Sequence, residues 1–299
     1  MEGINKTFCA SGKIRITCSK KVKLPVKVIK AATDKIKRIC DIFCKSFIKG
    51  VIETKDANYI TSQLTKEAML NSHIHLDFDN VNTPSAATTG AIVPATGKNN
   101  WDSVIQCCAE DDNRHFALGI HPWFIEDHQM IDLYDLEIKI EDEKPAAVGE
   151  CGLDYLKVKD QNQQRFFFDE QISLANRYKL PLIVHAVQAT EDATDLLKSH
   201  ASSRGVIHAY SGSLQQAKKL VDMGFYLGFG SRLADQNAYK LHDIVKFIPL
   251  EFLLIETDDN QDSDGLIKVI ERIAKIKKID VEEAVQRCDD NARTLFNLT

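Results

Sequence analysis

Apolar runs of strand length alternate with longer amphipathic stretches from residue 69 to the end of the chain. The apolar runs end near eight positions, spaced by 21 to 33 residues: His75, Thr96, His121, Asp154, Ala186, Ala209, Gly230 and Asp258. Some, such as 182–184 and 252–255, are apolar at every position, which is typical of strands buried on both faces of a parallel sheet. Eight strands alternating with helices predict a (β/α)8 TIM barrel over residues 69–299. A doubly wound sheet is the alternative, but it does not collect side chains from nearly all its strands at one rim.

The first 68 residues lie outside this alternation. Apolar residues recur there at steps of three and four: Ile29, Ala32, Ile36, Ile39, Cys40, Phe43, Phe47 and Val51. Lysines and arginines lie between them, so 28–52 is predicted to form a basic amphipathic helix. Three interpretations stay open: an extension docked on the barrel or partly disordered, a helix that contacts a membrane surface or protein partner, and a segment upstream of a natural start at Met69.

Charge divides the chain at the same place. Residues 1–70 hold 15 Lys and Arg against 6 Asp and Glu, whereas residues 71–299 hold 23 against 37. An acidic body argues against broad electrostatic capture of nucleic acid, which depends on many basic contacts to phosphate. A substrate phosphate would have to be held by metal ions and a few local donors.

Cysteine usage and hydropathy predict a cytoplasmic protein. The eight cysteines form no C-x-x-C pair, and in a chain of this length they are expected to be reduced thiols. No apolar run approaches the length of a transmembrane helix. The first residues also lack the uninterrupted apolar core of a secretory signal.

Metal-ligand side chains lie at or just past the ends of the apolar runs. They are His73, His75, Glu150, His185, His208 and Asp258. In a parallel barrel the carboxyl ends of the strands share one rim, so these six side chains are expected to meet. Mixed imidazole and carboxylate ligands bind divalent ions and suit the activation of water. This ligand set does not determine whether the metal is Mg, Mn or Zn. The structural alternatives are hydrogen-bonded core histidines and helix-capping carboxylates.

Three positions suggest particular roles. His73 and His75 are two residues apart, so on a strand both imidazoles point to one side and can reach one ion. Glu150 lies between glycines that let the backbone approach closely, and its carboxylate can bridge two cations. Asp258 can bind metal and accept a proton from the attacking water. His121 is interpreted as a substrate contact, with Trp123 as a stacking or lid residue.

These residues resemble the TatD family of metal-dependent deoxyribonucleases, a branch of the amidohydrolase superfamily. The shared motifs are H-x-H at 73–75, Gly-Ile-His-Pro at 119–122, Gly-Glu-x-Gly-Leu-Asp-Tyr at 149–155, Leu-Pro-x-x-x-His at 180–185, His-x-Tyr-Ser-Gly-Ser at 208–213 and Glu-Thr-Asp at 256–258. The resemblance implies a TIM barrel, two divalent ions held by the six side chains above, and phosphodiester hydrolysis, often as a 3′–5′ exonuclease on DNA.

The chain departs from the family pattern at three places. Asn71 stands where an aspartate is usual, Ala186 and Val187 replace a frequent Ser-Arg, and 259–264 is short and acidic where many members have proline and a long basic loop. Fewer cationic contacts predict weaker binding of a nucleic-acid backbone.

The leading hypothesis is a two-metal phosphodiesterase that uses metal-activated water. One ion would be held by His73, His75 and Asp258 and the other by His185 and His208, with Glu150 bridging them and Asp258 as base. The candidate substrate contacts are His121, Tyr155, Ser211 and Arg232, and Asp154 is expected to orient a ligand. The alternatives are a hydrolase of a small amide, lactone or ester, and a non-catalytic barrel that binds a partner through 28–52.

Overall fold

The computed structural model describes residues 4–8, 14–18, 69–76, 90–202, 204–258 and 265–298. The chain forms two units, Met1–Ile60 and Thr61–Thr299. The predicted division into 1–68 and 69–299 stays a prediction. In the first unit, β1 (Ile4–Phe8) pairs antiparallel with β2 (Ile14–Cys18), two strands that the sequence analysis did not anticipate. The predicted helix at 28–52 lies outside the described residues.

The second unit is a nearly closed parallel barrel. Its strands are β3 (Leu70–Asn71), β4 (Gly90–Pro94), β5 (Arg114–Leu118), β6 (Ala147–Asp154), β7 (Leu182–Val187), β8 (Gly205–Ile207), β9 (Tyr226–Phe229) and β10 (Leu253–Ile255). They follow one another around the sheet in chain order. The segments that follow the first and last strands meet through a parallel bridge between Ile74 and Asp258. The TIM-barrel prediction is therefore confirmed.

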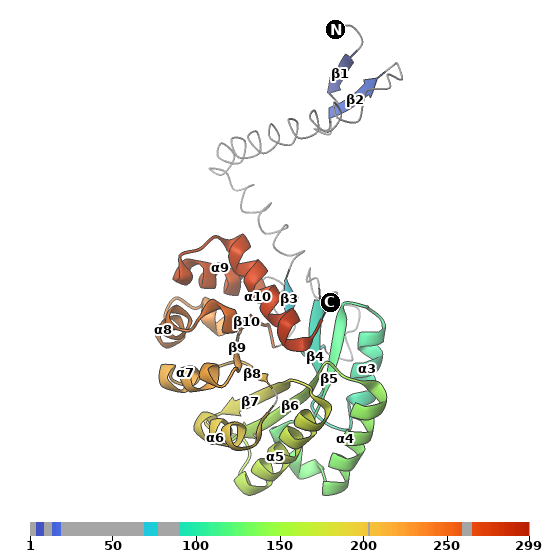
Figure 1. The fold of residues 1–299 in the computed structure, drawn as a ribbon, viewed down its shortest axis with the longest axis vertical. Helices are drawn as coiled ribbons and strands as arrows, with labels where there is room; N and C mark the ends of the chain where they lie inside the picture. The colour runs from blue at the N-terminus through green and yellow to red at the C-terminus, as the bar shows by residue number, and fades with distance from the viewer. Residues whose placement is uncertain are drawn as a thin grey trace. The chain divides into compact units, whose positions relative to one another are not determined.

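Helices lie around the outside of the strands (Figure 1). They are α3 (Trp101–Ala109), α4 (Met130–Glu143), α5 (Gln161–Tyr178), α6 (Thr190–His200), α7 (Leu214–Asp222), α8 (Tyr239–Phe247), α9 (Gly265–Lys277) and α10 (Val281–Phe296). Short 3-10 helices, η1 (Pro122–Asp127), η2 (Ser231–Ala234) and η3 (Leu250–Phe252), follow β5 and β9 and precede β10. Among the described residues, no helix is long and apolar enough to cross a membrane.

One cluster of buried residues inside the barrel takes a side chain from every strand. These side chains are Leu70, Ile92, Ala117, Ala147, Ile183, Val206, Tyr226 and Leu254. The last turns of α10 pack against them through Ala292, Leu295 and Phe296. A filled barrel is a packed core rather than a channel, so its chemistry belongs at the carboxyl ends of the strands.

Candidate metal centre

Asn71 fixes the segment that carries the first two histidines. Its side-chain oxygen accepts hydrogen bonds from the backbone N–H groups of His73, at 3.3 Å, and Thr257, at 3.2 Å. Its amide nitrogen donates to the Thr257 hydroxyl at 2.8 Å. Strand β3 ends at Asn71, earlier than the sequence predicted, and these bonds hold the residues beyond it against the end of β10. Through these three hydrogen bonds Asn71 has a local structural role.

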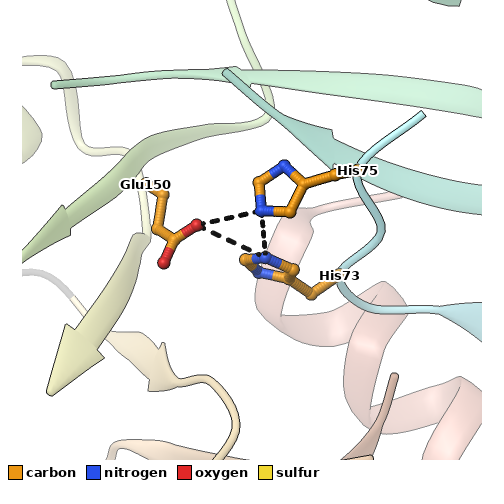
Figure 2. Close-up of side chains that lie close together, drawn as sticks. All are labelled: His73, His75 and Glu150. Carbon is orange, nitrogen blue, oxygen red and sulfur yellow. Dashed lines mark hydrogen bonds and ion pairs between the residues drawn. The ribbon is translucent and has the colours of Figure 1, made fainter. Parts of the chain in front are cut away.

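Four side chains converge on one point, one from within β6 and the others from the segments just past β3 and β10. His73 Nε2 and His75 Nε2 lie 3.2 Å apart, and Glu150 Oε2 lies 3.5 and 3.2 Å from them (Figure 2). Asp258 Oδ1 lies 3.5 Å from His73 Nε2 and 3.8 Å from His75 Nε2. Ligand atoms of a tetrahedral ion with bonds of about 2.0–2.1 Å are roughly 3.3–3.4 Å apart. The spacing of this first group fits a small divalent cation.

A second group faces the other oxygen of Glu150. His185 Nδ1 lies 3.0 Å and His208 Nε2 lies 2.7 Å from Glu150 Oε1. The two histidine nitrogens are 3.1 Å apart. Glu150, which is almost completely buried, therefore presents one oxygen to each group.

Asp154 sets the orientation of His185. Asp154 Oδ2 accepts from His185 Nε2 at 3.0 Å and from Trp123 Nε1 at 2.6 Å. Asp154 Oδ1 accepts from the backbone N–H groups of Leu156 and Lys157. A carboxylate oxygen only accepts, so His185 Nε2 donates to Asp154. This turns His185 Nδ1 toward Glu150 Oε1 and His208 Nε2, the orientation that a metal ligand needs.

His121 has the opposite arrangement of donor and acceptor. Its Nδ1 accepts from the backbone N–H of Trp123 at 3.1 Å, so its Nε2 carries the proton and donates to Glu150 Oε1 at 3.0 Å. The His121 side chain thus reaches the centre and donates a hydrogen bond to Glu150.

The charges in the centre are strongly coupled. Burial raises the pKa of Glu150, but the charges of His208 and His121 outweigh it and hold that pKa well below its usual range. Burial lowers the pKa of His208, yet the Glu150 carboxylate raises it to about 9. Burial and the neighbouring His208 lower the pKa of His73. A carboxylate ionised this deep in the protein needs positive charge beside it, which protons or a cation can supply.

Unpartnered atoms test whether a metal fits. Among the described residues, Glu150 Oε2 and His73 Nδ1 are buried side-chain atoms that have no hydrogen-bond partner. Buried polar atoms are normally paired, so an orphaned carboxylate oxygen that faces two imidazole nitrogens favours a cation. Imidazole nitrogens and carboxylate oxygens are also a donor set that Zn and Mn accept.

A glycine permits the close approach of β6 and β7 here. Gly152 has φ +132°, and a Cβ built on it would collide with the carbonyl oxygen of His185. The predicted need for glycine beside Glu150 is met at this position, since any side chain would push the His185 backbone away.

Comparison with known proteins identifies the family. The sequence model of the TatD related DNase family matches residues 71–297, most of the chain. The chain belongs to the TatD family. It is 32% identical over 254 residues to the uncharacterised metal-dependent hydrolase YjjV of Escherichia coli K12, covering 77% of this chain and 98% of that relative. It is 35% identical over 203 residues to the uncharacterised metal-dependent hydrolase YabD of Bacillus subtilis, covering 63% and 80%.

The solved structure of YjjV, a TatD homologue from Escherichia coli, superposes with a TM-score of 0.72 at 31% identity. The match covers 78% of this chain and all of that one. The protein is therefore a TatD-family metal-dependent hydrolase, and its clustered His, Glu and Asp side chains support the use of divalent metal.

The predicted substrate contacts of this TatD-family barrel lie in different places. Arg232 lines a pocket with Tyr210, Thr257 and Asp258, next to the first group. The Tyr155 hydroxyl donates to Asp192, which also pairs with Arg165, so Tyr155 belongs to a separate cluster.

Ser211 lies in the turn after β8, where its carbonyl oxygen accepts a hydrogen bond from Lys240 at 2.8 Å. The acidic segment 259–264 lies outside the described residues.

Sequence reasoning passed over Glu256. This residue is buried at the end of β10, where Oε1 accepts from the backbone N–H of Ala209 at 2.5 Å and lies 3.8 Å from His208 Nδ1. Burial raises its pKa to about 7. The Glu-Thr-Asp motif contained the signal. Glutamate is seldom buried unless it is paired, so a glutamate directly after a fully apolar strand marks a position where a partner is expected.

Proposed function

We propose that this protein is a two-metal phosphodiesterase that acts as a 3′–5′ exonuclease on single-stranded DNA. The observation that carries the proposal is the position of Glu150, whose two oxygens face two adjacent groups of ligand atoms. Paired ions that share a carboxylate suit in-line displacement at phosphorus, because charge develops on the attacking and leaving oxygens together.

The proposed ligand sets follow the two groups. His73, His75 and Asp258 would hold one ion, His185 and His208 the other, and Glu150 would bridge them. Mg, Mn and Zn all suit this donor set. When bound, the ions would supply Lewis-acid polarisation of the phosphoryl group and lower the pKa of the attacking water.

The remaining roles are assigned to residues of the chain. Asp258 is proposed as the base, since its side chain is half exposed and lines the pocket, where it can meet water and substrate. The His121 Nε2–H group, already polarised by Glu150, is proposed to donate to the substrate phosphoryl oxygen. Arg232 would bind phosphate from the pocket wall, and Ser211 and Tyr155 would contact the substrate further out.

A second candidate is a hydrolase of a small amide, lactone or ester. The acidic balance of residues 71–299 favours it, because such a surface repels a long polyanion and a small substrate needs no extended basic groove. The same metal centre would serve, since carbonyl hydrolysis also needs a Lewis acid and an activated water.

A cytosolic location belongs to the same proposal. Within the described residues, Cys107, Cys108, Cys151 and Cys288 are buried free thiols, which is typical of a reducing compartment. The interpretation of 28–52 as a contact for a protein or membrane surface stays a prediction.

Single-stranded DNA labelled at its 5′ end tests the proposal. Wild-type protein with Mg²⁺ or Mn²⁺ is expected to give a ladder of stepwise shorter products, and Glu150→Gln is expected to lose this activity. Glu110→Gln is the matched control, because Glu110 is exposed at the end of α3, and it should cut as wild type does. Intact DNA together with hydrolysis of a small amide, lactone or ester would replace the proposal with the second candidate.

A further inference from the structure

Trp123 is held rigidly beside the metal centre with its indole partly open to solvent. It is 42% exposed. Its Nε1–H donates to Asp154 at 2.6 Å, and its ring packs edge-to-face against His121 and His185, with centroids 5.0 and 5.7 Å away. A hydrogen-bonded indole with two ring contacts is a fixed surface rather than a swinging lid.

Lys157 covers that surface without an acidic partner. Its ammonium nitrogen lies 3.2 Å from the centroid of the Trp123 ring, a cation–π contact. The Lys157 backbone N–H is bonded to Asp154, but among the described residues no carboxylate pairs with its ammonium group. A positive charge is thus kept at the mouth of the centre by an aromatic face that a substrate group could take over.

We propose that Trp123 and Lys157 form a nucleotide-binding element of this site. The Trp123 face receives the base of the nucleotide next to the cleaved bond, and the displaced Lys157 ammonium contacts a phosphate of the same strand. The inference rests on the proposed phosphodiester hydrolysis and adds to it the residues that recognise the nucleotide.

The geometry predicts how this element selects substrates. Every base has an aromatic face, so stacking on Trp123 tolerates all four bases. A base can stack there only after it has left its own neighbours, which favours single-stranded ends. One lysine adds one phosphate contact, so affinity should depend weakly on salt, as suits a body whose acidic residues outnumber its basic ones.

Tryptophan fluorescence tests binding without hydrolysis. The chain has two tryptophans, and Trp101 is buried, so a ligand at the surface reports on Trp123. The probe is a thymidine trinucleotide with phosphorothioate linkages, with Mg²⁺ present. We expect saturable quenching, and at least about tenfold weaker binding of the same backbone with abasic sugars. Equal binding of the two ligands, or unchanged emission on binding, would overturn the proposal.

Variants separate stacking from a structural role of the indole. Trp123→Phe keeps a ring but loses the bond to Asp154, whereas Trp123→Ala loses both. We expect Phe to retain most of the preference for the base-bearing ligand and Ala to abolish it. If both variants lose the preference for the base-bearing ligand equally, Trp123 acts by positioning Asp154. That result would overturn the nucleotide-binding element.

A lysine pair provides the matched test of the charge. Lys157→Gln is expected to weaken trinucleotide binding several-fold and to reduce the slope of log affinity against log salt by about 0.7. Lys159 is an exposed lysine of the same loop, and Lys159→Gln should bind as wild type does. Identical behaviour of the two variants would contradict the role of Lys157.

Hydrolysis assays keep the two proposals apart. If wild type shows the predicted quenching but cuts neither DNA nor the unmodified trinucleotide, the nucleotide-binding element is supported and the proposed phosphodiester hydrolysis is wrong. If wild type cuts base-bearing and abasic ends equally and shows no quenching, the reaction stands and the element is wrong.

Discussion

His185 donates a hydrogen bond from Nε2 to Asp154 Oδ2 over 3.0 Å, and this contact decides which nitrogen of His185 faces Glu150. Burial raises the pKa of Asp154, but its hydrogen bonds from His185 and Trp123 outweigh this and lower the pKa below its usual range. An ionised, fully bonded Asp154 makes the His185 Nδ1 lone pair a better ligand.

Asp154→Asn is expected to weaken binding of the metal ion that His185 is proposed to hold by about 10- to 100-fold. The amide can still accept from one neighbour but cannot polarise His185. Isothermal titration with Mn²⁺ or Zn²⁺ measures the change. Asp195→Asn is the control, because Asp195 is an exposed carboxylate on α6 and should leave the titration unchanged. Equal metal affinities for Asp154→Asn and wild type would show that Asp154 does not support metal binding.

Gly152→Ala is expected to lower the free energy of unfolding by about 3 kcal/mol or to prevent folding, because overpacking against a backbone atom cannot relax locally. Gly224→Ala is the comparison. Gly224 also has positive φ, at +86°, but its Cβ would meet only the side chain of Arg204. The Gly224 change should cost about 1 kcal/mol, and equal losses in urea titrations would argue against the close approach of β6 and β7.

Asp132→Ala tests the N-terminus of α4. Asp132 accepts from the backbone N–H of Gln129 at 2.8 Å and from Lys98 at 2.7 Å, and these bonds lower its pKa. A depressed carboxyl pKa stabilises the fold above the unfolded-state value of about 3.9, and this stability is lost as pH falls through the folded-state pKa.

Asp132→Ala should therefore lower the free energy of unfolding by about 1 kcal/mol at pH 7 and by less near pH 3. Asp135→Ala removes only the other, more exposed partner of Lys98 and should change the free energy of unfolding by under about 0.5 kcal/mol. A loss for Asp132→Ala that is the same at both pH values would contradict the capping role.

Metal addition should stabilise the fold by mass action. At a free Mn²⁺ concentration of about 100 Kd, the expected gain is about 2.7 kcal/mol, reversed by chelation. Thermal unfolding curves with Mn²⁺ and with EDTA measure it. Glu150→Gln should lose most of the shift and Glu110→Gln should keep it; a full shift in Glu150→Gln would place the bound metal elsewhere.

The strand ends were predictable because buried strands are continuously apolar and their terminal polar residues share one rim. This placed Glu150 on β6 and His185 on β7, and put His208 just past β8. The exact strand lengths were not predictable. Strand β3 is two residues long, and His75 is held by a backbone bond to Asp258, a contact between residues far apart in the sequence.

The side-chain contacts between loops could not be predicted from the sequence either. The hydroxyl of Tyr155 is engaged by Asp192, and the ammonium of Lys157 lies on Trp123. Both depend on rotamers chosen among several neighbours, which no residue spacing encodes. At the start of α10, Asp280 is the N-cap, yet within the described part of the chain its side chain makes no capping hydrogen bond.

The proposed bridging role of Glu150 is tested most directly by anomalous diffraction from crystals of the protein soaked in Mn²⁺. The account predicts two anomalous peaks, one among His73, His75 and Asp258 and one between His185 and His208, each in contact with a different oxygen of Glu150. A single peak, or two peaks that do not share Glu150, would contradict the two-metal centre.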